Sequence, residues 1–284
     1  MLTVLLFCIR YDPLTQSNSI LFDQARHVCE GLDVVKLRQT TNASQRDLLY
    51  QAAETARETG ARSVGLYYYK HCLDLLDAKP WDSTAEDASY GETLALYTKA
   101  AEAYWYMGRF EECSACLEEI FEHARDYADK APAAIIRSRM YAQQSNSRKA
   151  FLSLQDALIG LGVEIPESSW EECDDEFQRL FDPLVQTLQD ELEPASNINI
   201  DRDLATLGAL MVELLSAAFW TDALLFYQAT LKLMDIYLQK GIFPHVGWYV
   251  KLGRTCDLYV VANCRLVSTS VPIGIYKCPN YPQR

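Results

Sequence analysis

The chain has 284 residues, of which 49% are hydrophobic and 23% charged, so it can bury a sizeable core, which argues against wholesale disorder. Its formal net charge is −13 and no basic stripe follows the chain, which argues against nucleic-acid binding. No apolar run approaches the roughly 18 residues that span a membrane. Nine cysteines, an odd number without a regular spacing, predict reduced thiols in a cytoplasmic protein rather than a disulfide framework.

The first helix is expected near Ile20, after an irregular or remnant N-terminal segment at residues 1–19. From there apolar residues recur at the i, i+3, i+4, i+7 spacing of one buried helix face, namely at Leu21, Phe22, Ala25, Val28 and Cys29. A long second helix is predicted through Ser44 to Glu58.

The clearest helical hairpin lies between Leu94 and Arg125. A large residue, two small ones, an aromatic, a glycine turn, a second aromatic and another small residue follow in order, at Tyr97, Ala100, Ala101, Tyr104, Gly108, Phe110 and Cys113. This order is typical of a tetratricopeptide repeat. Ala100 and Ala101 allow two helices to approach closely, and Gly108 can adopt a positive φ between them. Tyr104 and Phe110 are expected to fill the groove between the helices.

Three further segments fit the same frame. An earlier one has Gly60 at the turn and Gly65 at the small position of the second helix. A third has Ala150 there, with Ser145-Asn146-Ser147 in place of the glycine turn. A fourth, containing Leu207, Leu210, Met211, Leu214, Trp220 and Tyr227, has Ala223 there. The small position recurs at irregular intervals, so the prediction is an all-α fold of tetratricopeptide-like helix-turn-helix repeats in an irregular right-handed α-solenoid.

This solenoid is expected to be interrupted once. Residues 20–163 form the main repeat array and residues 203–265 form further hairpins. Between them, residues 164–202 are an acidic insertion with a short helix: thirteen Asp or Glu and two Arg lie between Glu164 and Asp203. A solvated face is the simplest interpretation, and an electrostatic docking site is the alternative. Residues 266–284 hold three prolines and are expected to be an irregular tail.

No motif for catalysis or for a cofactor is present, so no catalytic, cofactor-binding or metal-binding residue is predicted. Cys113 and Cys116 form a CxxC pair, but a zinc site needs a second pair and a redox site needs a preceding strand. Cys113 instead occupies a packing position. A group of Cys256, Cys264, Cys278 and His245 fits no zinc spacing, although a cryptic metal protein or enzyme built on that region stays open as an alternative.

Two runs of adjacent aromatic residues must place some members outward, because three consecutive helical residues cannot share one face. The runs are Tyr67-Tyr68-Tyr69 and Tyr104-Trp105-Tyr106. Tyr68 and Trp105 are the members predicted to contact a partner.

The repeat segments also resemble a known family. The stretches that carry the resemblance are Ala52 to Tyr69, Pro80-Trp81-Asp82, Leu96 to Ala103, Gly108 to Glu112 and Leu158 to Pro166. They are similar to the helical region of fungal-type hybrid histidine kinases, in which a serine/threonine-kinase-like domain and an AAA ATPase precede the repeats and a GAF domain and a histidine kinase follow them. The resemblance covers about residues 20–240.

The resemblance implies a non-catalytic, cofactor-free fragment of a phosphorelay-type signalling kinase, since the family's catalytic domains lie outside this chain. Its partners would be protein segments or the neighbouring ATPase, GAF and histidine kinase domains. The alternative is a stand-alone tetratricopeptide adaptor protein unrelated to histidine kinases.

Overall fold

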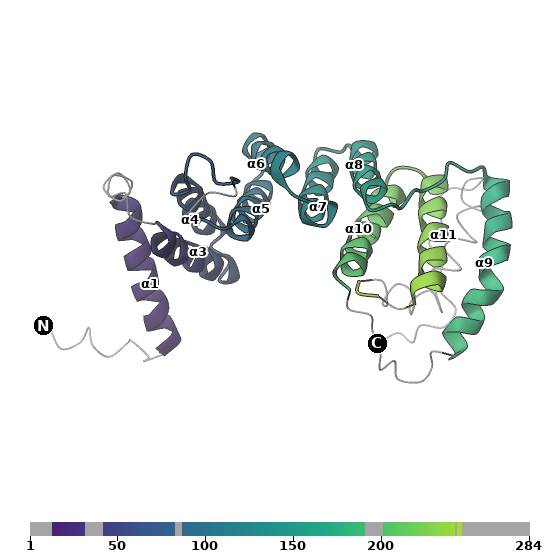
Figure 1. Cartoon of the computed structure of the whole chain (residues 1–284), viewed down its shortest axis with the longest axis horizontal. Helices are drawn as coiled ribbons and strands as arrows, with labels where there is room; N and C mark the ends of the chain where they lie inside the picture. Colours follow the sequence, from purple (N-terminus) through teal and green to yellow (C-terminus); the bar gives the residue numbers. More distant parts are fainter. Residues whose placement is uncertain (1–12, 32–41, 83–86, 191–200, 242, 246–284) are drawn as a thin grey trace, which may run out of the picture. The chain divides into compact units, whose positions relative to one another are not determined.

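The computed structural model describes residues 13–31, 42–82, 87–190, 201–241 and 243–245, and every regular element within them is an α-helix (Figure 1). None of these helices is long and apolar enough to cross a membrane. The chain divides into two compact units, residues 1–140 and 141–284.

Unit 1 is built from helical hairpins that stack in chain order. Its helices are α1 (Pro13–Glu30), α3 (Ala43–Glu58), α4 (Arg62–Asp74), α5 (Tyr90–Tyr106), α6 (Phe110–His123) and α7 (Tyr127–Gln143), the last of which crosses the boundary at residue 140. α3 packs against α4, α4 against α5 and α5 against α6, while α1 packs mainly on α3 (Figure 1).

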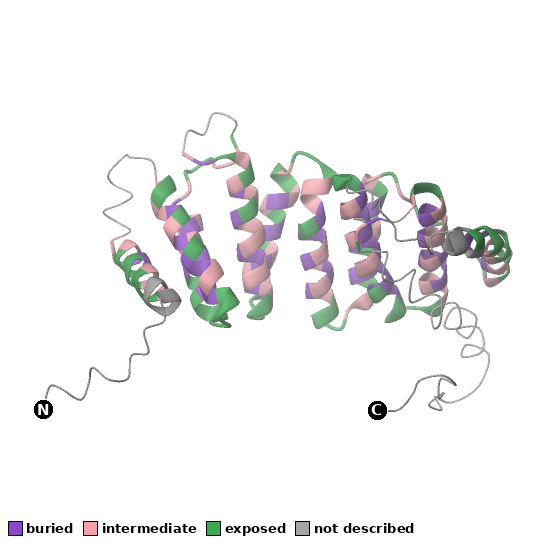
Figure 2. Cartoon of the chain, turned by 90° about the horizontal axis from the view of Figure 1, so that it is seen from below, coloured by how far each residue is buried: buried purple, intermediate pink, exposed green. Residues whose placement is uncertain are grey.

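Small residues let these helices approach each other. Ala52, Ala53 and Ala56 of α3 are fully buried, as are Ala100 and Ala101 of α5. Buried residues recur along the helices of the chain (Figure 2). Opposite the α3 alanines lies Gly65 of α4, whose missing Cβ would stand 3.2 Å from the Ala53 carbonyl oxygen. In α5 and α6, Tyr104 and Cys113 are buried and Phe110 is half-buried.

The turns between paired helices use left-handed backbone. Gly60 lies in the middle of the α3–α4 turn with φ +83°, and Gly108 lies between α5 and α6 with φ +69°. Ser145 takes the same role before α8 with φ 59°. Asn146 then caps α8 by accepting a hydrogen bond from the Lys149 amide at 3.1 Å, which explains how a Ser-Asn-Ser sequence replaces a glycine turn.

Unit 2 contains α8 (Ser147–Gly160), α9 (Trp170–Asp190), α10 (Arg202–Phe219) and α11 (Ala223–Lys240). α8 packs against α10, α10 against α11, and α11 against α9, so α9 lies outside its place in the chain order (Figure 1). The Gln228 side chain donates to the Ser168 carbonyl at 2.6 Å, and Arg179 lies 3.5 Å from Asp235. α9 and α11 therefore run in the same direction.

Three boundaries or positions differ from the sequence-based predictions. α1 begins at Pro13 rather than near Ile20, inside the segment expected to be irregular. The helix of the acidic insertion, α9, is long rather than short, with 21 residues. Ala223 is exposed and not a packing residue, because the Asp222 cap places it in the first turn of α11; Ala229 is the small residue buried there.

Candidate functional site: a buried arginine and the surfaces around it

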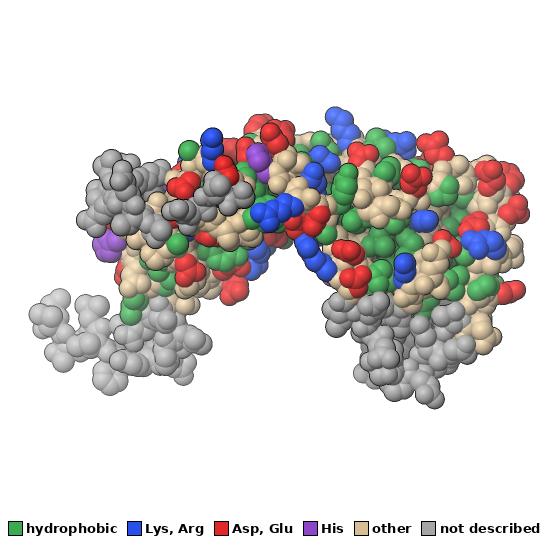
Figure 3. Space-filling view, viewed as in Figure 1, with side chains coloured by type: hydrophobic (Ala, Val, Ile, Leu, Met, Phe, Trp, Pro, Cys, Tyr) green, Lys and Arg blue, Asp and Glu red, His purple; other side chains and the backbone are tan. Residues whose placement is uncertain are grey.

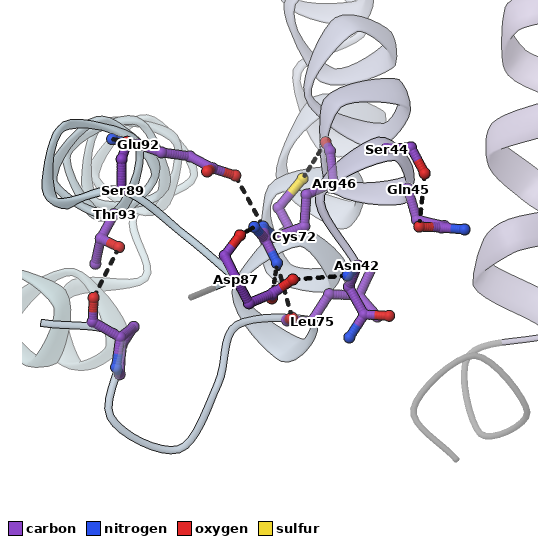
Figure 4. Close-up of polar contacts among 11 residues, drawn as sticks. Asn42, Ser44, Gln45, Arg46, Cys72, Leu75, Asp87, Ser89, Glu92 and Thr93 are labelled. Atoms are coloured by element: carbon purple, nitrogen blue, oxygen red, sulfur yellow. Dashed lines mark hydrogen bonds and ion pairs between the residues drawn. The ribbon is translucent and has the colours of Figure 1, made fainter. Parts of the chain in front are cut away.

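Arg46 lies at the centre of the most extensive polar network in the described part of the chain. Its side chain comes from α3 and is only 1% exposed (Figure 4). Nε donates to Glu92 Oε1 at 2.8 Å, and Nη1 donates to the Leu75 carbonyl at 3.3 Å. Nη1 also pairs with the Asp87 carboxylate, and Nη2 donates to the Asp87 carbonyl at 2.6 Å. A buried guanidinium is tolerated only with such pairing.

This network joins four pieces of chain. Asp87 also accepts a hydrogen bond from the Asn42 amide at 2.7 Å, and the Cys72 thiol donates to the Arg46 carbonyl at 3.6 Å (Figure 4). Burial lowers the pKa of Arg46, but the hydrogen bonds to Glu92 and Asp87 outweigh that effect and raise the pKa above its usual value. The guanidinium of Arg46 thus binds four segments together. They are the start of α3, the end of α4, the connection after α4 and the start of α5.

The same connection presents an aromatic side chain to the α5–α6 hairpin. Trp81 stacks on His123 with ring centroids 5.3 Å apart and lies 5.2 Å from the ring of Tyr97. Its indole nitrogen donates to Glu119 at 3.2 Å. Trp81 and Arg46 therefore anchor the described residues on both sides of this connection, Trp81 on the α5–α6 hairpin and Asp87 on Arg46.

A polar row crosses α3 and α5. Lys99 lies 3.8 Å from both Glu54 and Glu102, and Arg57 pairs with Glu54 at 2.7 Å. The Tyr69 hydroxyl donates to the same Glu54 carboxylate. Burial raises the pKa of Glu54, but the hydrogen bonds from Arg57 and Tyr69 prevail and lower it. These half-buried charges give the face formed by α3 and α5 a fixed pattern.

The predicted contact aromatics are placed differently from each other. Tyr68 does not face outward: it is 6% exposed and stacks on Phe22 of α1, whereas Tyr67 is 48% exposed. The outward prediction for Tyr68 is wrong because α1 covers that side of α4. Trp105 is half-buried, with Arg139 5.7 Å above its ring and its indole nitrogen buried without a hydrogen bond.

The CxxC pair lies in the core. Cys113 and Cys116 are both buried, and burial raises the pKa of Cys113 to about 11 and that of Cys116 to about 12. Thiols of this kind are poor nucleophiles and poor metal ligands at neutral pH. Among the described residues, no three His, Cys, Asp or Glu side chains come close enough to hold a metal ion. Cys256, Cys264 and Cys278 lie outside the described residues, as does the tail at 266–284.

Sequence reasoning missed the Arg46 network. The available signal was a lone arginine on the apolar face of α3, three residues before the buried Leu49, with Asp87 and Glu92 at the other end of an insertion.

Comparison with known proteins gives one informative similarity. The chain is 23% identical over 183 residues, or 64% of its length, to the peroxide stress-activated histidine kinase mak3 of Schizosaccharomyces pombe. That match spans 8% of the kinase's own length. No family model matches the chain, and no solved structure matches it. The similarity is therefore to one segment of a much larger histidine kinase.

Proposed function

We propose that this chain is a non-catalytic, tetratricopeptide-like region, with the right-handed solenoid arrangement of such repeats, that makes protein or interdomain contacts in a cytoplasmic phosphorelay-type signalling kinase. The observation that carries the proposal is the similarity to mak3 over 183 residues of an all-helical chain. The core placement of the described CxxC pair is compatible with a binding role and offers no reactive thiol.

The contact face proposed for unit 1 is the one formed by α3 and α5. In helical-repeat proteins the first helices of successive hairpins commonly line the binding surface. Here that face carries the paired charges of Glu54, Lys99 and Glu102, and Asp47 and Gln51 extend it along α3. Because the carboxylates of Asp47, Glu54 and Glu102 outnumber the cations of Lys99 and Arg57, a partner segment with basic and polar side chains fits this face best.

The first test reads the genomic sequence on both sides of the reading frame. The proposal expects an ATPase module upstream and a GAF domain or histidine kinase downstream. If neither is encoded, the chain is instead a stand-alone adaptor.

The second test measures binding of the full chain to those neighbouring domains by calorimetry. We expect Lys99→Glu combined with Glu102→Lys to weaken binding about tenfold, since the charge pattern of the α3–α5 face is reversed. Glu122→Lys on α6 is the control and should leave the affinity unchanged. Failure of every neighbouring domain to bind the wild-type chain would contradict the proposal.

A further inference from the structure

α9 and α11 each carry an apolar stripe whose residues are spaced alternately three and four positions apart. The α9 stripe consists of Trp170, Cys173, Phe177, Leu180 and Leu184. The α11 stripe consists of Leu224, Tyr227, Leu231, Met234 and Leu238. Residues of both stripes form one buried cluster and pack around it. This spacing is that of the seam along which two helices of a coiled coil pack.

Polar contacts beside the stripes fix the direction of the two helices. Near the start of both, the Tyr227 hydroxyl donates to Asp174 Oδ1 at 3.2 Å. Further along both, Arg179 of α9 lies 3.5 Å from Asp235 of α11. Because the contacts advance together along the two helices, the pair is parallel, as neighbouring helices of many coiled coils are.

α9 lies at the edge of unit 2. Among the helices that the structure describes, it packs on α11 and on no other (Figure 1). The side of α9 that faces away from α11 is polar, and its exposed residues include Glu171, Glu172, Asp175, Gln178, Arg179 and Asp182. Acidic side chains gather over it in the space-filling view (Figure 3). Removing α9 therefore opens no other pair of described helices.

α11 has a second buried face that does not depend on α9. Ala229, Leu233 and Ile236 are buried, and on a helix they lie roughly opposite the α11 stripe. Since α11 also packs against α10, this second face lies against α10. α11 can therefore stay in place without α9 and present its apolar stripe to another helix.

α9 also has features that lower its own stability as a helix. Pro183 lies inside it and has no amide hydrogen to donate to the preceding turn. Glu171 and Asp175 lie four residues apart, where like charges on a helix repel. A helix of this kind owes most of its stability to the packing of its apolar face. The contact with the α11 stripe is thus what holds α9 in place.

We propose that α9 is a displaceable cover over the α11 stripe, and that an amphipathic helix of a protein partner takes its place there. The contacts of α9 define that partner by its chemistry. Its helix runs parallel to α11 and carries apolar side chains alternately three and four positions apart. It places a hydrogen-bond acceptor beside the Tyr227 hydroxyl, as Asp174 does, and a cation beside Asp235, as Arg179 does. The α11 stripe is separate from the α3–α5 face and does not depend on the kinase assignment.

The first test asks whether α9 opens by itself in the wild-type full chain. Native-state hydrogen exchange at increasing urea, read by mass spectrometry, compares amides of α9 with those of α10. We expect α9 to exchange through a local opening populated to about 1%, at urea concentrations that leave α10 protected. Exchange of α9 only together with α10, when unit 2 unfolds as a whole, would overturn the proposal.

The second test offers the α11 stripe a helix in trans. The probe is a fluorescein-labelled synthetic peptide with the sequence of residues 168–190, and fluorescence anisotropy gives its affinity for the full chain. We expect Leu180→Asp in the chain to tighten binding about 100-fold, because the variant releases its own α9 and frees the stripe. Gln178→Asp adds the same charge on the exposed side of α9 and should bind as weakly as the wild type.

Two further changes test the chemistry of the site. Adding Leu231→Asp to the Leu180→Asp chain should abolish binding, since it places a charge in the α11 stripe itself. A peptide with Arg179→Glu should bind the Leu180→Asp chain about tenfold more weakly than the unaltered peptide, because a carboxylate then faces Asp235.

Circular dichroism, together with protection of the α10 amides, establishes whether the Leu180→Asp chain is folded. If it is folded and binds the peptide no more tightly than the wild type, the proposal fails. If it unfolds, the hydrogen exchange of the wild-type chain decides alone. A wild-type dimer in light scattering that Leu231→Asp dissociates would assign the α11 stripe to a second copy and overturn the assignment to a separate partner.

Discussion

At the scale of single residues, Arg46 is the side chain whose removal should cost the most. Arg46→Met leaves the largely buried carboxylate of Asp87 without its cation, although it keeps most of the side-chain volume. Breaking one partner of a buried ion pair costs about 3–5 kcal/mol. We expect a loss of that size in the free energy of unfolding measured by urea denaturation.

Arg57→Met is the control for this change, since Arg57 pairs with Glu54 at the surface and is 43% exposed. Surface pairs contribute about 1 kcal/mol or less. If Arg46→Met were no more destabilising than Arg57→Met, the Arg46 network would not stabilise unit 1 as a buried ion pair does.

Glu54 gives the stability of unit 1 a dependence on acid pH. Its folded-state pKa is lowered from 4.5, so the ionised form is favoured in the folded state. That contribution is present above the unfolded pKa and is lost as the pH falls through the folded pKa. We expect Glu54→Gln to reduce the loss of stability between about pH 5 and pH 3, measured by urea denaturation at each pH. Glu122→Gln should leave the acid dependence as it is in the wild type.

The sequence predicted which small residues are buried better than it predicted which charged side chains pair with each other. Ala100, Ala101 and Cys113 are found buried because a repeating pattern of size determines which positions can face a neighbouring helix. Arg46 could not be found that way, because its partners Asp87 and Glu92 lie more than 40 residues further along the chain and meet it only after α4 has turned back. Tyr68 was misplaced for a similar reason, since α1 covers it from outside the repeat.

At the scale of helices, Gly208 of α10 marks a close approach between backbone segments in the described part of unit 2. A Cβ there would stand 2.2 Å from the Pro244 carbonyl oxygen and 3.2 Å from the Phe243 ring. Alanine favours a helix over glycine by about 1 kcal/mol, yet Gly208→Ala should destabilise by about 1–3 kcal/mol because backbone must move. Gly91→Ala in α5, where a Cβ meets nothing within 4 Å, should be neutral or stabilising. Thermal denaturation of both variants measures the difference, and a stabilised Gly208→Ala would contradict the packing.

The packing of α5 against α6 should protect the thiols of Cys113 and Cys116 from alkylation. Because burial raises the pKa of Cys113 to about 11 and of Cys116 to about 12, few thiolates form at neutral pH. Iodoacetamide should leave both unmodified in the folded chain and alkylate both in concentrated urea, as measured by peptide mass spectrometry. Alkylation of Cys113 in the folded chain at the rate of a free thiol would show that the helix pair opens.

Helix boundaries were predictable where caps and turns are local. The predicted end of the second helix at Glu58 is the observed end of α3, because Gly60 follows it closely. In the fourth repeat the pattern predicted packing positions for Trp220 and Ala223, but both are exposed, because α11 begins only at Ala223 after the Asp222 cap. The full length of α9 escaped prediction because its apolar face is completed by residues of α11, more than 50 positions away.

At the scale of the whole molecule, the net charge of −13 should make stability depend on salt. Added salt screens repulsion between carboxylates, so the melting temperature should rise between about 0.02 and 0.5 M NaCl. Asp175→Asn should stabilise by about 0.2–0.5 kcal/mol at low salt. Glu172→Gln should lower the melting temperature slightly, because it weakens the hydrogen bonds that Glu172 and Ser169 exchange at the start of α9. A melting temperature unaffected by salt would show that repulsion between the carboxylates of residues 164–182 does not destabilise the fold.

The Arg46 network should also couple the stability of the α3–α4 hairpin to the segment that follows it. In a simple repeat protein each hairpin forms and then extends the array, one neighbour at a time. Here the hairpin of α3 and α4 alone offers the Arg46 guanidinium only the Leu75 carbonyl, because its carboxylate partners Asp87 and Glu92 lie beyond α4. We therefore expect a piece that runs from α3 through the start of α5 to be more stable than the α3–α4 hairpin alone.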